Sequence, residues 1–142
     1  MFSCETETYL NIPPKHGYPV TFKSCFVNKH DGSDGHQPMD IETGRFFAPI
    51  AGFYEFHFYG NGVNGKDTEI LVRVNGITRL KSFLDADQNN ADDFLQLSFH
   101  CILYLEKDDD IQLFVPKGQI WAEAPHNEFE SVFTGKLVQK MK

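Results

Sequence analysis

The sequence predicts an all-β fold, an antiparallel sandwich built from about eight to ten short strands. Strand-like segments recur roughly every ten residues, with Gly, Pro, Asn and Asp between them, as in sandwiches and barrels. The 142 residues include 14 Phe and 5 Tyr, and such bulky planar side chains suit the half-buried face of a sheet. No long helical segment separates the strands, so we expect connections that run from one end of the sandwich to the other.

The first part of the chain predicts two strands, each followed by a loop. Residues 1–9 have an extended character, and the two prolines at 13–14 then prevent the ladder from continuing. Residues 20–27 form the next expected strand, and residues 28–38 form a polar surface loop punctuated by glycine. In the second strand, alternation predicts two opposite faces, one with Phe22, Ser24 and Phe26 and the other with Lys23, Cys25 and Val27.

The most informative strand is expected over residues 52–59, where aromatic side chains occupy every second position. Asn61-Gly62 and Asn64-Gly65 are expected in the turn that follows it. The side chains that should point into the core are Tyr54, Phe56 and Phe58. The opposite face should point to solvent or to a neighbouring subunit, and it holds Phe53, Glu55, His57 and Tyr59.

The rest of the chain predicts a hairpin followed by three strands. Asn75-Gly76 is a strong hairpin signal, so we expect residues 69–74 and 77–83 to pair. Residues 94–105 form a long apolar strand, and the three aspartates at 108–110 end it, one of them bonding turn amides. One face of the long strand is expected to hold Phe99, Cys101, Leu103 and Leu105. The last two strands are expected over residues 111–115 and 131–139.

The charge and the apolar pattern argue against two classes of partner. The chain has 13 Lys and Arg against 20 Asp and Glu, a net charge of −7, and neither end carries a basic cluster. We therefore expect no nucleic acid partner, because nothing would follow a phosphate backbone. The longest apolar runs are far shorter than the roughly 20 residues that span a bilayer, so we expect no membrane insertion. No secretory signal opens the chain as given.

We expect the protein not to be an enzyme, and no catalytic residue is assigned. The sequence contains neither Gly-x-Ser-x-Gly nor His-Glu-x-x-His, and no cysteine is set at a helix start. His57 and His100 are interpreted as interface or packing residues. Cys101 lies in the most apolar strand, where a thiol ordinarily packs as a small apolar side chain and is unreactive.

The three cysteines are Cys4, Cys25 and Cys101, and none belongs to a Cys-x-x-Cys pair or a zinc-binding spacing. An odd number leaves at least one thiol free or paired between chains. A disulfide between Cys4 and Cys25 stays open as an alternative. Free thiols are nevertheless the expectation, because a domain of this size does not need a covalent link.

An acidic run at residues 85–93 offers side-chain oxygens at the spacing of a calcium loop. It lacks the Gly and the bidentate Glu of an EF-hand, so its plainer interpretation is a solvated acidic turn. Calcium is the cofactor that this run suggests, and its candidate ligands are Asp85, Asp87, Asn89 and Asp93.

Two further features have a functional and a plain interpretation. His30 and His36 could hold a transition metal or respond to pH, but histidines in a polar loop are ordinarily just exposed. Trp121 could stack on a sugar ring or on a protein partner, or it could cap one end of the sandwich.

Residues 52–58 have the sequence Gly-Phe-Tyr-Glu-Phe-His-Phe. This run resembles the signature Gly-x-Tyr-x-Phe-x-Phe/Tyr of the C1q globular domain, the head of complement C1q and its relatives. Phe46 precedes this signature by six residues, and Phe22 precedes Asn28 by six, as in the family. Residues 133–137 resemble the Phe-Ser/Thr-Gly-x-Leu that closes the last strand. Weaker matches cover nearly the whole chain, at residues 2–4, 40–44, 47–49, 74–76 and 105–113.

The resemblance implies a ten-stranded jelly roll, shared with the tumour-necrosis-factor ligands, as a single extracellular domain over residues 1–142 that assembles as a homotrimer. Two features depart from the family: residues 28–38 contain an insertion, and the collagen-like stalk is not in the chain as given. The family residues expected to build the core and the trimer packing are Phe22, Asn28, Phe46, Gly52, Tyr54, Phe56, Phe58, Phe133, Gly135 and Leu137.

The function implied is recognition. We expect a homotrimer that binds protein or polysaccharide ligands on macromolecular or microbial surfaces, in innate immunity. A receptor-binding signalling ligand of the tumour-necrosis-factor kind and a head that only oligomerises are the alternatives. Trp121 is the one candidate for ligand contact.

Overall fold

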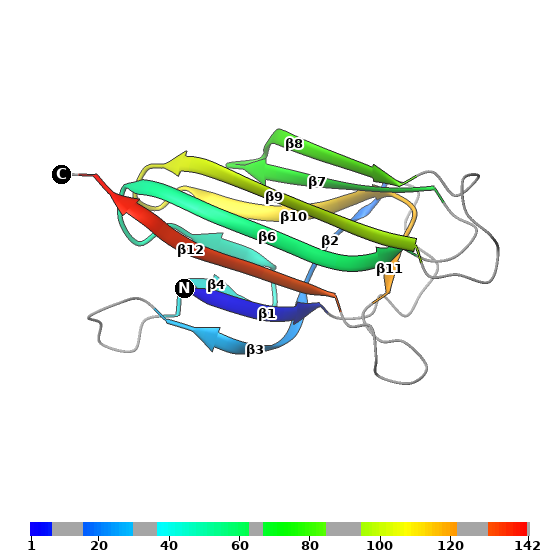
Figure 1. Ribbon diagram of the computed structural model, residues 1–142, viewed down its shortest axis with the longest axis horizontal. Helices are drawn as coiled ribbons and strands as arrows, with labels where there is room; N and C mark the ends of the chain where they lie inside the picture. The colour runs from blue at the N-terminus through cyan, green and yellow to red at the C-terminus, as the bar shows by residue number, and fades with distance from the viewer. Residues whose placement is uncertain (7–15, 30–36, 63–66, 85–94, 122–130, 142) are drawn as a thin grey trace.

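The computed structural model describes residues 1–6, 16–29, 37–62, 67–84, 95–121 and 131–141, and every regular element in these ranges is a strand (Figure 1). The described residues form no helix of the length and apolarity that crossing a membrane requires. The strands are β1 (Phe2–Thr6), β2 (Tyr18–Pro19), β3 (Phe22–Asn28), β4 (Met39–Asp40), β5 (Arg45–Phe47), β6 (Gly52–Gly62), β7 (Thr68–Val74), β8 (Ile77–Leu84), β9 (Leu95–Leu105), β10 (Asp110–Lys117), β11 (Ile120–Trp121) and β12 (Val132–Lys140). They outnumber the expected eight to ten because β2, β4 and β11 are two-residue pairings.

The strands form two antiparallel sheets. The first sheet has the order β11-β6-β12-β1-β3, and β9 pairs with β6 as well. The second has the order β4-β5-β10-β7-β8, and β2 also pairs with β10. Figure 1 shows β6 running between β9 and β12, which come from distant parts of the chain. This is the end-to-end connectivity of a jelly roll, so the predicted all-β antiparallel sandwich is confirmed.

Aromatic rings fill the space between the sheets. The ring centroid of Phe2 lies 5.0 Å from that of Phe46 and 5.1 Å from that of Phe133, and Phe56 stacks on Phe133 at 5.9 Å. All four side chains are buried, and they come from β1, β5, β6 and β12. Burying each such side chain contributes roughly 1.5–3 kcal/mol, so this cluster ties together strands of both sheets.

Gly135 of β12 allows the closest approach within this cluster. A Cβ at this position would overlap the ring of Phe2 and lie 2.9 Å from a ring carbon of Phe56. Because real Cβ atoms do not approach ring carbons so closely, only glycine lets the aromatic rings lie against the β12 backbone.

The predicted hairpin at Asn75-Gly76 is confirmed. Asn75 has φ 51° and Gly76 has φ 81°, the two positive values that a type I′ turn requires. The side-chain amide of Asn75 donates to Oδ1 of Asp109 at 2.9 Å, and Oδ2 of Asp109 accepts the backbone N–H of Glu106 at 2.9 Å. The expectation that one of the three aspartates bonds a turn amide is therefore confirmed.

The turn expected at Asn61-Gly62 is wrong, because β6 continues through Gly62. Asn61 pairs with Gln96 of β9 on one side and with Trp121 of β11 on the other. Ladder hydrogen bonds on both sides hold the segment extended, and they outweigh the local preference of Asn-Gly for a turn. Asn64-Gly65 lies outside the described residues.

The expected faces of the β3 strand are also wrong. Phe22 is 3% exposed, whereas Phe26, predicted for the same face, is 66% exposed. The β1–β3 register shifts twice, between Ser3 and Cys4 and between Glu5 and Thr6. Each shift adds a residue to β3 without a partner on β1, so strict alternation fails and Phe26 turns to the surface.

The same register shift overturns the expectation that all three thiols are free. Cys4 and Cys25 form a disulfide, and they are direct partners across the β1–β3 pair. Cys25 packs against the core, on the side where Cys4 is fully buried. A domain of this size does not need a covalent link. Two cysteines that face each other nevertheless form a disulfide in an oxidising environment. Cys101 is the free cysteine among the described residues.

Candidate functional site

The outer face of the first sheet, the side that points away from the second sheet, exposes several large apolar side chains. Phe53 and Tyr59 on β6 and Ile102 and Tyr104 on β9 are between 38% and 52% exposed. They share one side because residues two apart along a strand point the same way, and the register sets Phe53 opposite Tyr104. We call the residues of β6, β9 and β12 on this side the outer face.

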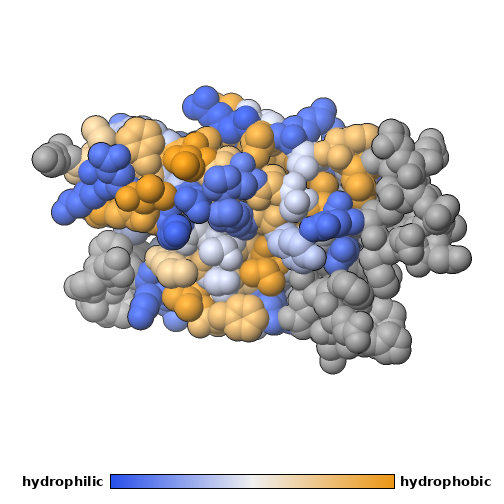
Figure 2. Space-filling view, in the orientation of Figure 1, coloured by the Kyte–Doolittle hydropathy of each residue, from blue (hydrophilic) through white to orange (hydrophobic). Residues whose placement is uncertain are grey.

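One end of the outer face is the more apolar. The rings of Phe53 and Tyr104 meet edge to face at a centroid distance of 5.4 Å. Val138, at the register shift of β12, and Met141 are also exposed near this end, where the Met141 N–H donates to the carbonyl of Ala51. Figure 2 shows hydrophobic surface gathered at the end of the molecule nearest the C terminus, with hydrophilic surface among it.

The middle of the outer face carries a polar cluster of Glu55, His57 and His100. Nε2 of His57 donates to Oε1 of Glu55 at 2.8 Å, and Nε2 of His100 lies 3.7 Å from the same oxygen. The two imidazole rings lie 4.2 Å apart between centroids. The hydrogen bond from His57 lowers the pKa of Glu55 below its ordinary value, and the positive charge of Lys136 adds to this effect.

Strand pairing brings this cluster together. Glu55 and His57 are two residues apart on β6, and His57 is the direct partner of His100 on β9. Lys136 of β12 is the partner of Glu55 on the other side. The sequence placed Glu55 and His57 on one outward face and singled out His100 as an interface or packing residue, but it gave no signal that His100 lies opposite His57. Only the β6–β9 register could have shown that the two histidines meet.

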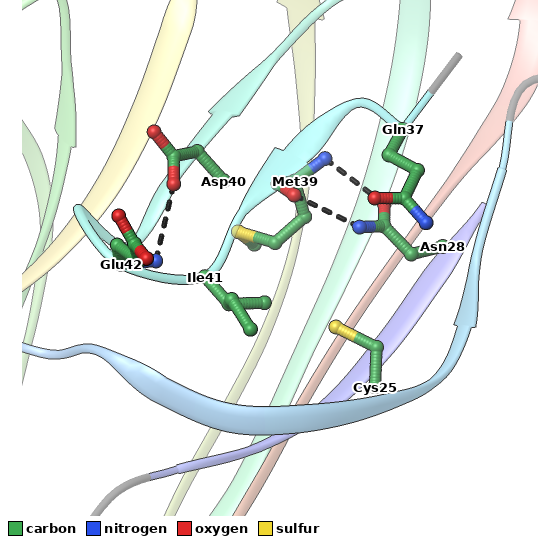
Figure 3. A pocket seen from close by; sticks show the side chains of 7 residues that line it. All are labelled: Cys25, Asn28, Gln37, Met39, Asp40, Ile41 and Glu42. Carbon is green, nitrogen blue, oxygen red and sulfur yellow. Dashed lines mark hydrogen bonds between the residues drawn. The ribbon is translucent and has the colours of Figure 1, made fainter. Parts of the chain in front are cut away.

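A second feature is a hollow of about 550 Å³ beside β4, lined by Cys25, Asn28, Gln37, Met39, Asp40, Ile41 and Glu42 (Figure 3). The side chain of Asn28 donates to the carbonyl of Met39 at 2.8 Å and accepts its N–H at 3.0 Å (Figure 3). Oδ1 of Asp40 accepts the backbone N–H of Glu42 at 3.1 Å. The side chain of Asn28 therefore clamps β3 to β4.

The aromatic residues singled out by the family motif lie in the core. Buried side chains of this set are Phe22, Phe46, Tyr54, Phe56, Phe58 and Phe133. Gly52 and Gly135 are buried as well, and Leu137 packs against the core. The hydroxyl of Tyr54 donates to the carbonyl of Ile50 at 2.6 Å, and burial raises its pKa. These residues shape the scaffold and leave surface contacts to other positions.

Several sequence-predicted positions fall outside the described residues. The proposed calcium ligands Asp85, Asp87, Asn89 and Asp93 are among them. His30 and His36 also lie outside, and so does the side chain of Trp121, whose backbone pairs with Asn61. Cys101 is half-buried on the inward side of β9, and burial raises the pKa of its thiol. A raised pKa keeps the thiol protonated, and a protonated thiol is unreactive.

Comparison with known proteins agrees with this architecture. A family model described as the C1q domain matches residues 1–138. The globular domain of zebrafish complement 1qA is similar with a TM-score of 0.69 at 20% identity, covering 99% of this chain and 98% of that chain. Murine APRIL is similar with a TM-score of 0.60, both at pH 8.5 (9% identity, 94% and 95% covered) and at pH 5.0 (13% identity, 96% and 100% covered). The structural likeness shows the fold, and because the family model spans almost every residue, the chain belongs to the C1q domain family.

Proposed function

We propose that this chain is a homotrimeric recognition module, which acts outside the cell in innate immunity by binding macromolecular or microbial-surface ligands. Membership of the C1q domain family carries the proposal, because domains of this family typically form trimers and bind protein ligands without catalysis. The disulfide between Cys4 and Cys25 supports an extracellular site of action, since disulfides persist in oxidising compartments.

The outer face of the first sheet is the surface that we assign to contact between copies. Its aromatic and aliphatic side chains are exposed in a single chain, and covering them would remove apolar area from water. On the second sheet, Arg73 lies over the ring of Phe114 at 3.9 Å, and Lys117 lies 5.9 Å from the ring of Phe83, which stays 51% exposed. There the chain's own cations cover part of the aromatic surface.

A solution mass of three times 16.3 kDa is the first expected result, measured by light scattering coupled to size exclusion. Ile102→Asp places a charge in the assigned contact and should shift the protein toward single chains, because a buried unpaired carboxylate opposes assembly. Ile77→Asp is the matched control. Ile77 is 62% exposed at the tip of the β7–β8 hairpin and should leave the trimer intact.

Two outcomes would contradict this assignment. A wild-type mass of one chain at high concentration would exclude the homotrimer. If Ile77→Asp disrupted the trimer and Ile102→Asp did not, the contact would lie on the other sheet.

Recognition itself is tested by retention on polysaccharides and on bacterial surfaces. Three copies in one particle bind a repetitive surface more tightly than one copy does, because the second and third contacts are intramolecular. The wild-type trimer should therefore be retained about 100-fold more strongly than the Ile102→Asp single chain. Equal retention of the two would contradict a multivalent mode of binding.

The second candidate is a receptor-binding signalling ligand, and the likeness to murine APRIL favours it. Binding of a soluble receptor ectodomain at one copy per chain, without retention on polysaccharide, would support this candidate. A trimer that binds neither class of ligand would instead act as an oligomerising head for attached segments.

A further inference from the structure

We propose that Glu55, His57 and His100 bind one divalent transition-metal ion per chain, and zinc is the ion that we choose to test it. One donor atom from each side chain lies within 4.8 Å of the other two, which is the starting geometry of a three-ligand site. The proposal goes beyond recognition by the trimer, because a single chain supplies all three ligands.

The backbone holds the three ligands without help from a loop. Glu55 and His57 stand on the same side of β6, and His100 faces His57 directly from β9. The two strands pair continuously from Gly52 to Gly62, so the ligand backbones are fixed by ladder hydrogen bonds on both sides of the site. Side-chain rotation alone has to close the site around an ion.

Two of the three donor separations lie close to those of a zinc site. Zinc bonds of about 2.0–2.2 Å at tetrahedral angles place donor atoms roughly 3.3 Å apart. Oε1 of Glu55 lies 2.8 Å from Nε2 of His57 and 3.7 Å from Nε2 of His100, values on either side of that separation. In a single chain the two histidine side chains are 54% and 50% exposed, so there they have room to turn toward an ion.

The donor set favours a transition-metal ion over calcium. Two imidazole nitrogens and one carboxylate oxygen are a set that zinc accepts in proteins, whereas calcium takes six to eight oxygen ligands. Three protein ligands leave the fourth tetrahedral position open. Water can fill it in a single chain, and a group of a neighbouring copy can fill it in the proposed trimer.

Lys136 opposes the ion and provides a second test. It is the β12 partner of Glu55, and its charge already favours the ionised carboxylate. A zinc ion held by Glu55 would be repelled by this ammonium group. Removing the charge of Lys136 should therefore tighten zinc binding, which is the opposite sign from removing a ligand.

The experiment is calorimetric titration of the full chain with zinc chloride in a buffer that does not chelate metal. We expect one ion per chain and a loss of about tenfold or more in affinity for His57→Ala, His100→Ala and Glu55→Gln. Lys136→Met should bind zinc more tightly than the wild type. His57, His100 and Lys136 are exposed and Glu55 is half-buried on the outer face rather than in the core, so the variants should keep the circular dichroism spectrum of the wild type.

Histidines elsewhere in the chain are the matched controls. His16→Ala removes an exposed histidine outside the cluster, and His30→Ala with His36→Ala removes two histidines that lie outside the described residues. These variants should titrate like the wild type. Zinc binding that survives His57→Ala and His100→Ala, or that disappears with His30 and His36, would overturn the proposal, as would a ratio of one ion per three chains. Trimer mass measured in parallel separates a missing metal site from a missing assembly.

Discussion

The two sides of the first sheet carry different chemistry on neighbouring residues of the same strands. Phe56 is fully buried on the inward side of β6, and the next residue, His57, is exposed on the outward side. The same contrast separates Cys101 from His100 on β9 and Gly135 from Lys136 on β12. Because alternate residues of a strand point opposite ways, one strand can fix the fold with one set of side chains and present a different surface with the other.

This comparison assigns stability to the inward side and interaction to the outward side. Inward residues pack against aromatic rings of both sheets, so their shape is constrained by the scaffold. Outward residues contact one another and solvent, so they can vary without loss of the core. The family motif lies mostly on the inward side, and the cluster of Glu55, His57 and His100 lies on the outward side.

The largest expected effect tests that division on two adjacent residues. Phe56→Ala should lower the free energy of unfolding by about 3–5 kcal/mol, since it leaves a cavity among Phe2, Phe46 and Phe133. His57→Ala should change it by about 0.5 kcal/mol or less. Denaturant unfolding measures both, at one chain concentration because assembly adds to apparent stability. A similar loss of unfolding free energy in the two variants would contradict the assignment of stability to the inward side.

Sequence alone predicted those parts of the fold in which local pattern and tertiary pairing agree. The aromatic alternation of β6 and the Asn75-Gly76 turn each specify their structure within a few residues, and both predictions are confirmed. The local pattern could not predict which side chains of β3 point into the core. Its two register shifts arise from pairing with β1, and they place Cys25, rather than Phe26, on the core side.

The candidate site depended even more on long-range pairing. The sequence predicted that His57 faces outward and that His57 and His100 are both interface or packing residues, but the two lie 43 positions apart. Nothing in the local pattern states which residue of β9 lies opposite His57. A shift of the register by two residues would set Ser98 or Ile102 there instead, and the cluster would not form.

The disulfide provides the next prediction on the inward side. Replacing both Cys4 and Cys25 with Ser should lower the free energy of unfolding by about 3 kcal/mol, because the link closes a loop of 21 positions in the unfolded chain. The outward neighbour Ser3 bonds Thr134 through its hydroxyl at 3.1 Å, and Ser3→Ala should cost about 1 kcal/mol or less. Thermal unfolding of oxidised and reduced wild type provides an independent measure. A reduced protein as stable as the oxidised one would contradict the prediction.

The smallest expected effect concerns Cys101, whose thiol lies on the inward side of β9. Burial raises its pKa, so less thiolate is present in the folded chain than in the unfolded chain at the same pH. Iodoacetamide should therefore modify the native protein more slowly than the denatured protein, as mass spectrometry over a time course will measure. Equal rates would mean that solvent reaches the inward side of the sheet, and the distinction between the two sides would fail at this strand.

The pH dependence of stability follows from the same thiol. Above the ordinary pKa of a cysteine, the unfolded chain has begun to release the proton of Cys101 while the folded chain still holds it. The folded state then binds more protons, so the free energy of unfolding falls as pH rises through this range. Below that range the thiol is protonated in both states and contributes no slope. Cys101→Ala removes this contribution, so the unfolding free energy of the variant should fall less steeply with pH than that of the wild type, and identical slopes would contradict burial as the cause of the raised pKa.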